Sequence, residues 1–278
     1  RNHEFSSLTA TFLAVSIAIP VYMLIKCHFG EEYNAISINS FLFAEFAAAS
    51  LLIAMGAVLG RLNMEQYFIM AILFVPSYFI NEWLLLDSGM FNGFLDTGGS
   101  VAIHAFGAYF GLGMVATTGK KFEGKGELET DKVRNVFCLL GSMLLWLFWP
   151  SFTSSVVSGS LAILTAINTV FALAGSTLAT FIFSKWIRGA VEIEDMANAA
   201  LAGGVAIGSA CSSIDPGTSM LIGMIAGIVS TVGYAFIAEK VCAILKGTDT
   251  CGVHNLHGMP GLVGGLSAIV VTGNVGVQ

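Results

Sequence analysis

The chain has 278 residues, of which only 11% are charged, and its mean hydropathy is +0.81. A soluble domain carries about 25% charged residues, so this chain lacks the polar surface that a soluble fold needs. The net charge of −6 is spread over loops and indicates no nucleic-acid partner.

Apolar stretches of about 20 residues, the length that crosses a bilayer as a helix, recur along the chain. They predict an all-α polytopic membrane protein with nine spans. The expected spans are 8–27, 37–60, 66–86, 97–118, 135–157, 160–184, 195–212, 217–239 and 252–273. Pro20 and Pro76 fall inside spans, and Gly203, Gly223 and Gly227 predict close helix packing. The five cysteines have no framework spacing and are expected to be reduced packing residues.

Loop charge predicts the orientation. When alternate loops are assigned to two sides, one side holds eleven of the twelve basic residues and the other holds Lys26 alone. Positive charge stays inside, so the Lys/Arg-rich loops are expected to be cytoplasmic. The protein should lie in a cell membrane, either a plasma membrane or a bacterial inner membrane.

Two short segments repeat the pattern D-T-x-G-x-x-x-x-H, one from Asp96 to His104 and the other from Asp249 to His257. Five spans separate them, so the fourth and ninth spans should run antiparallel, as in an inverted-topology repeat. Each histidine lies eight residues into its helix, about 12 Å, and both should reach the middle of the membrane within contact distance. The two aspartates should cap these helices.

The repeat predicts three parts of the chain: a first repeat over 1–118, a cytoplasmic connector over 119–134 and a second repeat over 135–278. Spans two, three and four should match spans seven, eight and nine, and 8–27 should match 160–184. The span 135–157 is left without a match, so one helix is expected before Arg1.

Buried histidines in a membrane mark pathways, and two facing imidazoles can share one proton and bind a small polar guest. A metal site is the alternative, but it needs three or four ligands, and His254 is the only candidate third one. An ion-coupled carrier is a further alternative, with Glu45 and Glu82 as the carboxylates near span interiors. No cofactor motif and no enzyme motif is present, so no cofactor and no enzymatic activity is expected.

At these residues the chain resembles the Rhesus branch of the Amt/Mep/Rh ammonium transporter superfamily. The matching segments are DTGGSVAIHAFGAYFGL (96–112), LFWPSF (147–152), LAGGVAIGS (201–209) and NLHGMPGLVGG (255–265). The resemblance implies eleven or twelve spans in all, with one or two expected before Arg1 and the final helix of the second repeat expected after Gln278. It also implies a homotrimer, and a pore in each subunit that conducts ammonia.

The resemblance also implies roles for single residues. His104 and His257 match twin pore histidines, and Phe46 and Phe152 match two stacked phenylalanines at the external mouth. Supporting or recruitment positions are Asp96, Asp249, Thr153 and Asn198. Thr153 and Glu45 depart from the usual Asn and Asp of this branch.

The mechanism that this implies begins with ammonium recruited outside, which then loses its proton and passes as neutral ammonia. Its pKa lies about two units above neutral pH, so deprotonation costs about 3 kcal/mol. An unpaired ion in a dry pore costs far more. Alternative functions are a channel for carbon dioxide or methylammonia, an ammonium sensor, and a non-conducting subunit.

Overall fold

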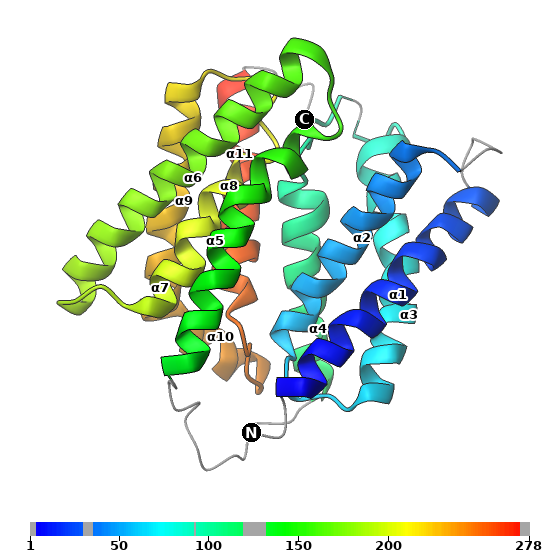
Figure 1. Ribbon diagram of the computed structural model, residues 1–278, viewed down its shortest axis with the longest axis horizontal. Coiled ribbons are helices and arrows are strands. Elements are labelled where there is room, and N and C mark those ends of the chain that lie inside the picture. Colours follow the sequence, from blue (N-terminus) through cyan, green and yellow to red (C-terminus); the bar gives the residue numbers. More distant parts are fainter. Residues whose placement is uncertain (1–3, 30–35, 92, 119–131, 273–278) are drawn as a thin grey trace.

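The computed structural model describes residues 4–29, 36–91, 93–118 and 132–272, and within these ranges all regular secondary structure is helical (Figure 1). The all-α membrane fold expected from the sequence is therefore confirmed. Seven helices of the described ranges are long and apolar enough to cross a membrane. The count of nine spans stays a prediction.

The first group of helices covers the expected spans one to four. It consists of α1 (Glu4–Phe29), α2 (Ile38–Ala57), α3 (Met64–Glu82) with the π-helical turn η1 (Trp83–Asp87), and the π-helical turn η2 (Ser100–Ala105) with α4 (Phe106–Thr118).

The second group covers spans five to nine. It consists of α5 (Lys132–Ser154), α6 (Gly159–Arg188), α7 (Ile193–Asn198) with η3 (Ala199–Leu201) and α8 (Ala202–Ile207), α9 (Pro216–Val232) with η4 (Gly233–Ile237) and α10 (Ala238–Leu245), and η5 (His254–Gly258) with α11 (Met259–Thr272).

Several helices begin at side-chain caps that the sequence carries. Ser37 forms a capping box with Ser40 before α2, and Asn63 forms one with Gln66 before α3. Asp215 accepts the N–H groups of Gly217 and Thr218 at the start of α9. These side chains satisfy backbone donors that a helix start leaves unpaired, which fixes where each helix begins.

The expected span 195–212 is not one continuous helix. The chain passes from α7 through the 3₁₀ turn η3 into α8, and the helix ends at Ile207, five residues before the expected end. Gly203 and Gly204 lie here against other elements, since an added Cβ at Gly204 would stand 2.6 Å from the Trp149 ring. The turn η3 consists of two alanines and a leucine, which have high helix propensity, so the break does not follow from local preference.

The two groups pack in the same way. Helix α1 packs against α2 and α3, and helix α6 packs against α8 and α9. Wide π turns also fall in matching elements, with η1 after α3 and η4 after α9, and with η2 before α4 and η5 before α11. Gly227 of α9 packs directly on α6, where an added Cβ would stand 2.6 Å from the Ser176 carbonyl oxygen, as expected for close helix contact.

Helices α4 and α11 run in opposite directions, and each packs against the π turn that precedes the other, α4 against η5 and α11 against η2 (Figure 1). We call the side at which η2 and α4 begin the upper face, and the side at which η5 and α11 begin the lower face. The N–H of Thr250 donates to the carbonyl of Ala57 at the end of α2, 3.0 Å away. Asp249 therefore lies at the lower face, where α2 ends, whereas Asp96 lies at the upper face.

Candidate functional site

The two D-T-x-G segments fold into the same local structure. The Asp96 carboxylate accepts the N–H groups of Val101 and Ala102 at 3.0 and 2.7 Å. The Asp249 carboxylate accepts the N–H groups of Val253 and His254, both at 3.0 Å. Both aspartates thus cap a helix start, as the sequence predicted.

A left-handed glycine follows each aspartate by three residues. Gly99 has φ of 70° and Gly252 has φ of 66°. A residue with a Cβ disfavours this conformation, so glycine is needed for the chain to turn into the helix. In both segments the turn leads into a π-helical stretch that contains the histidine.

The histidines meet between the two faces. The Nδ1 atoms of His104 and His257 lie 3.3 Å apart, and the two rings are inclined by 7°. The ring centroids lie 5.4 Å apart, farther than the nitrogens, so the rings meet edge to edge in one plane. The predicted contact between the two imidazoles is confirmed.

This geometry fixes what the pair can bind. One Nδ1 must carry the proton that the other Nδ1 accepts, so the two Nε2 atoms differ. One Nε2 carries a hydrogen and the other offers a lone pair. Among the described residues, the buried Nε2 of His104 has no hydrogen-bond partner. A small neutral guest that both donates and accepts suits such a pair.

Two phenylalanine rings lie between the histidines and the upper face. The Phe152 ring is 6.4 Å from His104, and the Phe46 ring is 4.9 Å from Phe152. The predicted contact is present, but the expected stacking is wrong, because the rings meet at 70°, edge to face. The positive edge of one ring faces the negative face of the other, which is the favoured arrangement.

Trp149 is a neighbour of His104 that the sequence analysis missed. Its indole lies nearly parallel to the imidazole, with centroids 5.5 Å apart and an angle of 22°. Gly204 of α8 leaves room for the indole ring. The run LFWPSF carried the signal, because Trp149 precedes Phe152 by three residues and therefore shares its helix face.

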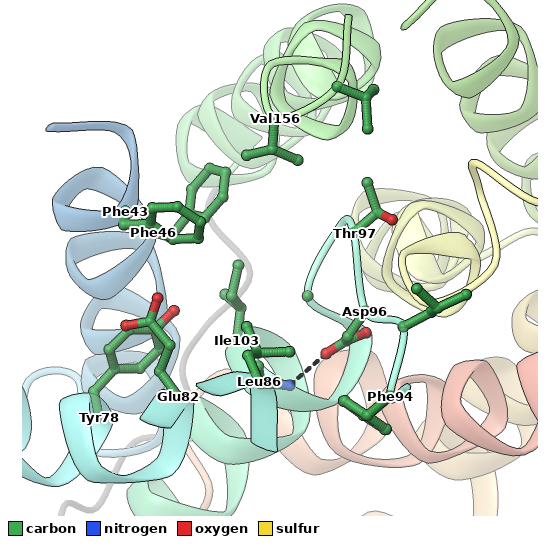
Figure 2. Close-up of a pocket in the computed structure, with 14 residues that line it drawn as sticks. Phe43, Phe46, Tyr78, Glu82, Leu86, Phe94, Asp96, Thr97, Ile103 and Val156 are labelled. Carbon is green, nitrogen blue, oxygen red and sulfur yellow. Dashed lines mark hydrogen bonds between the residues drawn. The ribbon is translucent and has the colours of Figure 1, made fainter. Parts of the chain in front are cut away.

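A cavity of about 240 Å³ opens above the phenylalanine rings. Figure 2 shows Glu82 and Tyr78 on one side of it and Asp96 on the other, with Phe46 nearby. The buried Glu82 accepts a hydrogen bond from the hydroxyl of Tyr22, and Ser209 donates to Asp96 at 2.6 Å. Burial raises the pKa of Asp96, and its hydrogen bonds partly oppose that shift.

A second cavity, of about 380 Å³, opens toward the lower face. His257 lines it together with Asn198 and Cys251, so the histidine pair lies between the two cavities. The Asn198 amide donates to the carbonyl of Glu194, 2.9 Å away. Burial raises the pKa of Asp249 at this end of the molecule.

Thr153 does not join the other predicted site residues. It is fully buried, and its hydroxyl forms a hydrogen bond of 2.7 Å with Thr169 of α6. It therefore connects α5 to α6 and does not line the upper cavity. Glu45 is exposed on the outside of α2 and does not line that cavity either.

His254, the candidate third metal ligand, lies apart from the pair. Its ring packs edge to face on Tyr109, with centroids 5.9 Å apart. Among the residues that the structure describes, no group of three His, Cys, Asp or Glu side chains could hold a metal ion. The central pair therefore offers two ligands, fewer than the three or four that a metal site needs.

Comparison with known proteins identifies similar sequences. A model of the Ammonium Transporter Family matches residues 5–275. Ammonium transporter Rh type B of Danio rerio is 37% identical over 97% of this chain and 60% of its own length. The human protein of the same name is 38% identical over 98% of this chain and 61% of its own length. The chain thus spans about three fifths of these curated relatives.

Solved structures are similar as well. Rh50 of Nitrosomonas europaea, a member of the Rhesus protein family of channels, is 48% identical with a TM-score of 0.91. The match covers 97% of this chain and 72% of Rh50. A sensor Amt protein has a TM-score of 0.72 at 24% identity, over 85% of this chain and 62% of its own, which shows a shared fold alone.

Proposed function

Since the chain belongs to the ammonium transporter family, and within it to the Rhesus branch, we propose that it is a membrane channel for ammonia. The observation that carries the proposal is the histidine pair. Two buried imidazoles joined through Nδ1 atoms 3.3 Å apart lie between two cavities and below two phenylalanine rings.

The proposed path begins in the upper cavity. Glu82 and Asp96 give it two carboxyl groups, and Phe43 and Phe46 give it aromatic faces, which together attract a small cation. The rings of Phe46 and Phe152 form an external gate that a hydrated ion does not pass. Ammonium gives up its proton to water in the upper cavity, above this gate, and neutral ammonia moves on to His104.

Energetics favour this order of events. Loss of the ammonium proton near neutral pH costs about 3 kcal/mol. Carrying the charge into an apolar site without a partner costs far more. The two Nε2 atoms then offer ammonia one donor and one acceptor, so the neutral guest regains part of its lost hydration. Asp249 and Asn198 support the lower exit.

We also propose an inverted repeat with halves 1–118 and 135–278 joined by the connector 119–134. The matched packing of α1 and α6 and the matched π turns support it. The charge asymmetry of the loops supports a cytoplasmic lower face, in a multi-pass protein of a cell membrane. The resemblance to the Rhesus branch supports a homotrimer with one pore in each subunit.

The test is ammonia uptake into proteoliposomes, with the internal pH and the membrane current recorded together. Entry of neutral ammonia raises the internal pH and carries no current. A current proportional to the ammonium flux would contradict passage of the neutral form. Uptake equal to that of protein-free liposomes would contradict the proposed function itself.

A further inference from the structure

The last turn of α1 carries a lysine that lies beside Phe43, a residue that lines the upper cavity. The Lys26 ammonium nitrogen lies 5.7 Å from the centroid of the Phe43 ring and 6.0 Å from that of Phe79. It also lies 3.7 Å from a carboxylate oxygen of Asp87. The two distances to the ring centroids are within the range at which a cation is attracted to an aromatic face.

The Phe43 ring connects this lysine to the proposed path. Phe43 lines the upper cavity, and its ring meets Phe46 edge to face with centroids 5.7 Å apart (Figure 2). The lysine charge is thus one aromatic ring away from the proposed gate. Of the same cavity, Glu82 lies just before the turn η1 and Leu86 lies within it, next to Asp87.

A fixed positive charge such as that of Lys26 is unusual beside a cavity that is proposed to attract cations. A lysine side chain ends in the same kind of charged group as the ammonium ion, and it already occupies an aromatic face at the rim. A fixed positive charge also repels a second cation that enters the cavity. The carboxylate of Asp87 cancels part of this repulsion, because opposite charges at this distance attract.

We propose that Lys26 is an affinity-determining residue, a resident ammonium group that competes with ammonium at the upper cavity, and that Asp87 limits its effect. The inference rests on the proposed ammonia channel. Lys26 does not contact the histidines, so it sets the ammonium concentration at which transport is half-maximal and leaves the maximal rate unchanged. The balance between Lys26 and Asp87 then tunes the channel to its ammonium supply.

The sign of each change follows from the charges. Lys26→Met keeps an apolar stem against Phe43 and removes the charge, so the half-saturating ammonium concentration should fall, by about two- to fivefold at low salt. Asp87→Asn leaves the lysine without its counter-charge, so that concentration should rise by a similar factor. Both effects should shrink in about 1 M sodium chloride, where the screening length falls to about 3 Å.

The experiment measures initial ammonium uptake against ammonium concentration in cells that lack ammonium transporters of their own. Wild type, Lys26→Met, Lys26→Arg and Asp87→Asn are compared at equal amounts of protein in the membrane. Lys26→Arg keeps the charge and should behave like wild type, which separates charge from packing. Lys185→Met, at the exposed lower end of α6, is the matched control for loss of a lysine.

Each outcome decides. The inference is supported if Lys26→Met alone among the lysine variants has a lower half-saturating concentration than wild type. Its maximal rate should be unchanged, and the effect should be lost in high salt. Equal curves for wild type and Lys26→Met overturn it, as does a Lys26→Arg variant that follows Lys26→Met. If Lys26→Met does not reach the membrane, the direction of the Asp87→Asn shift decides. Absence of uptake by the wild type overturns the proposed function itself, whatever the variants do.

Discussion

Gly99 and Gly252 hold the same left-handed backbone conformation, each three residues after a capping aspartate and five residues before a histidine of the central pair. The same backbone turn therefore precedes each histidine of the pair and orients its imidazole toward the other. Substitution of these glycines tests whether the turn is needed for the position of the pair.

Gly252→Ala should destabilise the protein by more than the backbone strain alone. The left-handed conformation costs a residue with a Cβ about 1–2 kcal/mol, and the new methyl group would also enter the Tyr234 ring. Gly60→Ala is the matched control, since Gly60 has φ of 73° and open space around its Cβ position. Unfolding in detergent gives the free energies, and equal losses for the two variants would contradict the predicted clash.

His104→Ala and His257→Ala should each lower ammonia flux by about tenfold while the protein stays folded. Each change removes one hydrogen bond to the guest, worth about 1–1.5 kcal/mol, and about 1.4 kcal/mol corresponds to a factor of ten in rate. Stopped-flow measurement of internal pH gives the flux. If both variants conduct like wild type, the pair is not part of the path.

Phe152→Ala should make transport carry current. The phenyl ring lies directly above His104, with centroids 6.4 Å apart, and its loss opens a route that a partly hydrated ion can use. Simultaneous current and pH recording detects the change. Phe148→Ala, one turn earlier on α5 with an exposed ring, is the control and should stay electroneutral. A Phe152→Ala variant that transports ammonia without current would contradict the assignment of the gate.

Ser209→Ala should destabilise the protein near neutral pH and much less in acid. The Ser209 hydroxyl donates to the Asp96 carboxylate at 2.6 Å, and a hydrogen bond to a charged group contributes about 1.5–3 kcal/mol. The bond favours the ionised carboxyl and so lowers the pKa of Asp96 in the folded state, against the effect of burial.

The contribution of this bond is therefore present above the pKa of Asp96 and is lost as the pH falls through it. Unfolding measured over a range of pH tests this sign. Ser213→Ala, an exposed hydroxyl in the same loop, serves as the control. A loss of stability that is equal at every pH would mean that Ser209 acts through packing alone.

Arg188→Ala should cost about 3–5 kcal/mol of stability, because it leaves a buried carboxylate without its counter-ion. Asp195 is fully buried and accepts two hydrogen bonds from the Arg188 guanidinium, at 2.9 and 3.1 Å. The exposed Lys185→Ala on the same turn should change stability by less than about 0.5 kcal/mol. Adding Asp195→Asn to Arg188→Ala should recover part of the loss, and unfolding of the double variant measures that recovery.

Much of the fold followed from the sequence, because long apolar runs and repeated letters are strong local signals. The opposed aspartates and the contact of His104 with His257 depend only on spacing and on an odd number of intervening helices. The break at η3 could not be predicted, since its residues, Ala199 to Leu201, have high helix propensity and carry no local signal for a break. To predict that Thr153 of α5 contacts α6, one must know how α5 is rotated about its own axis. A nearly uniform apolar helix does not reveal that rotation.

The angle between the two rings of the proposed gate could not be predicted from the sequence for a similar reason. The resemblance to the Rhesus branch brought Phe46 and Phe152 together, but the angle between two rings depends on rotamers that the whole neighbourhood selects. Trp149 was visible in the same run of residues. It was overlooked because an aromatic side chain in an apolar span has lipid or core contacts as its ordinary explanation.

The π turns at the two histidines place a counting constraint on the chain. A π turn accommodates one residue more than an α turn, so each imidazole points where it does because of a surplus residue just before or around it. Deleting one residue between Gly99 and His104, or between Gly252 and His257, would close the wide turn to an α turn and so move the imidazole relative to the capped helix start. A substitution keeps the number of residues in the turn, whereas a change of length alters the turn itself. Related proteins should therefore differ in the residue types of the D-T-x-G-x4-H segments more often than in the length of these segments.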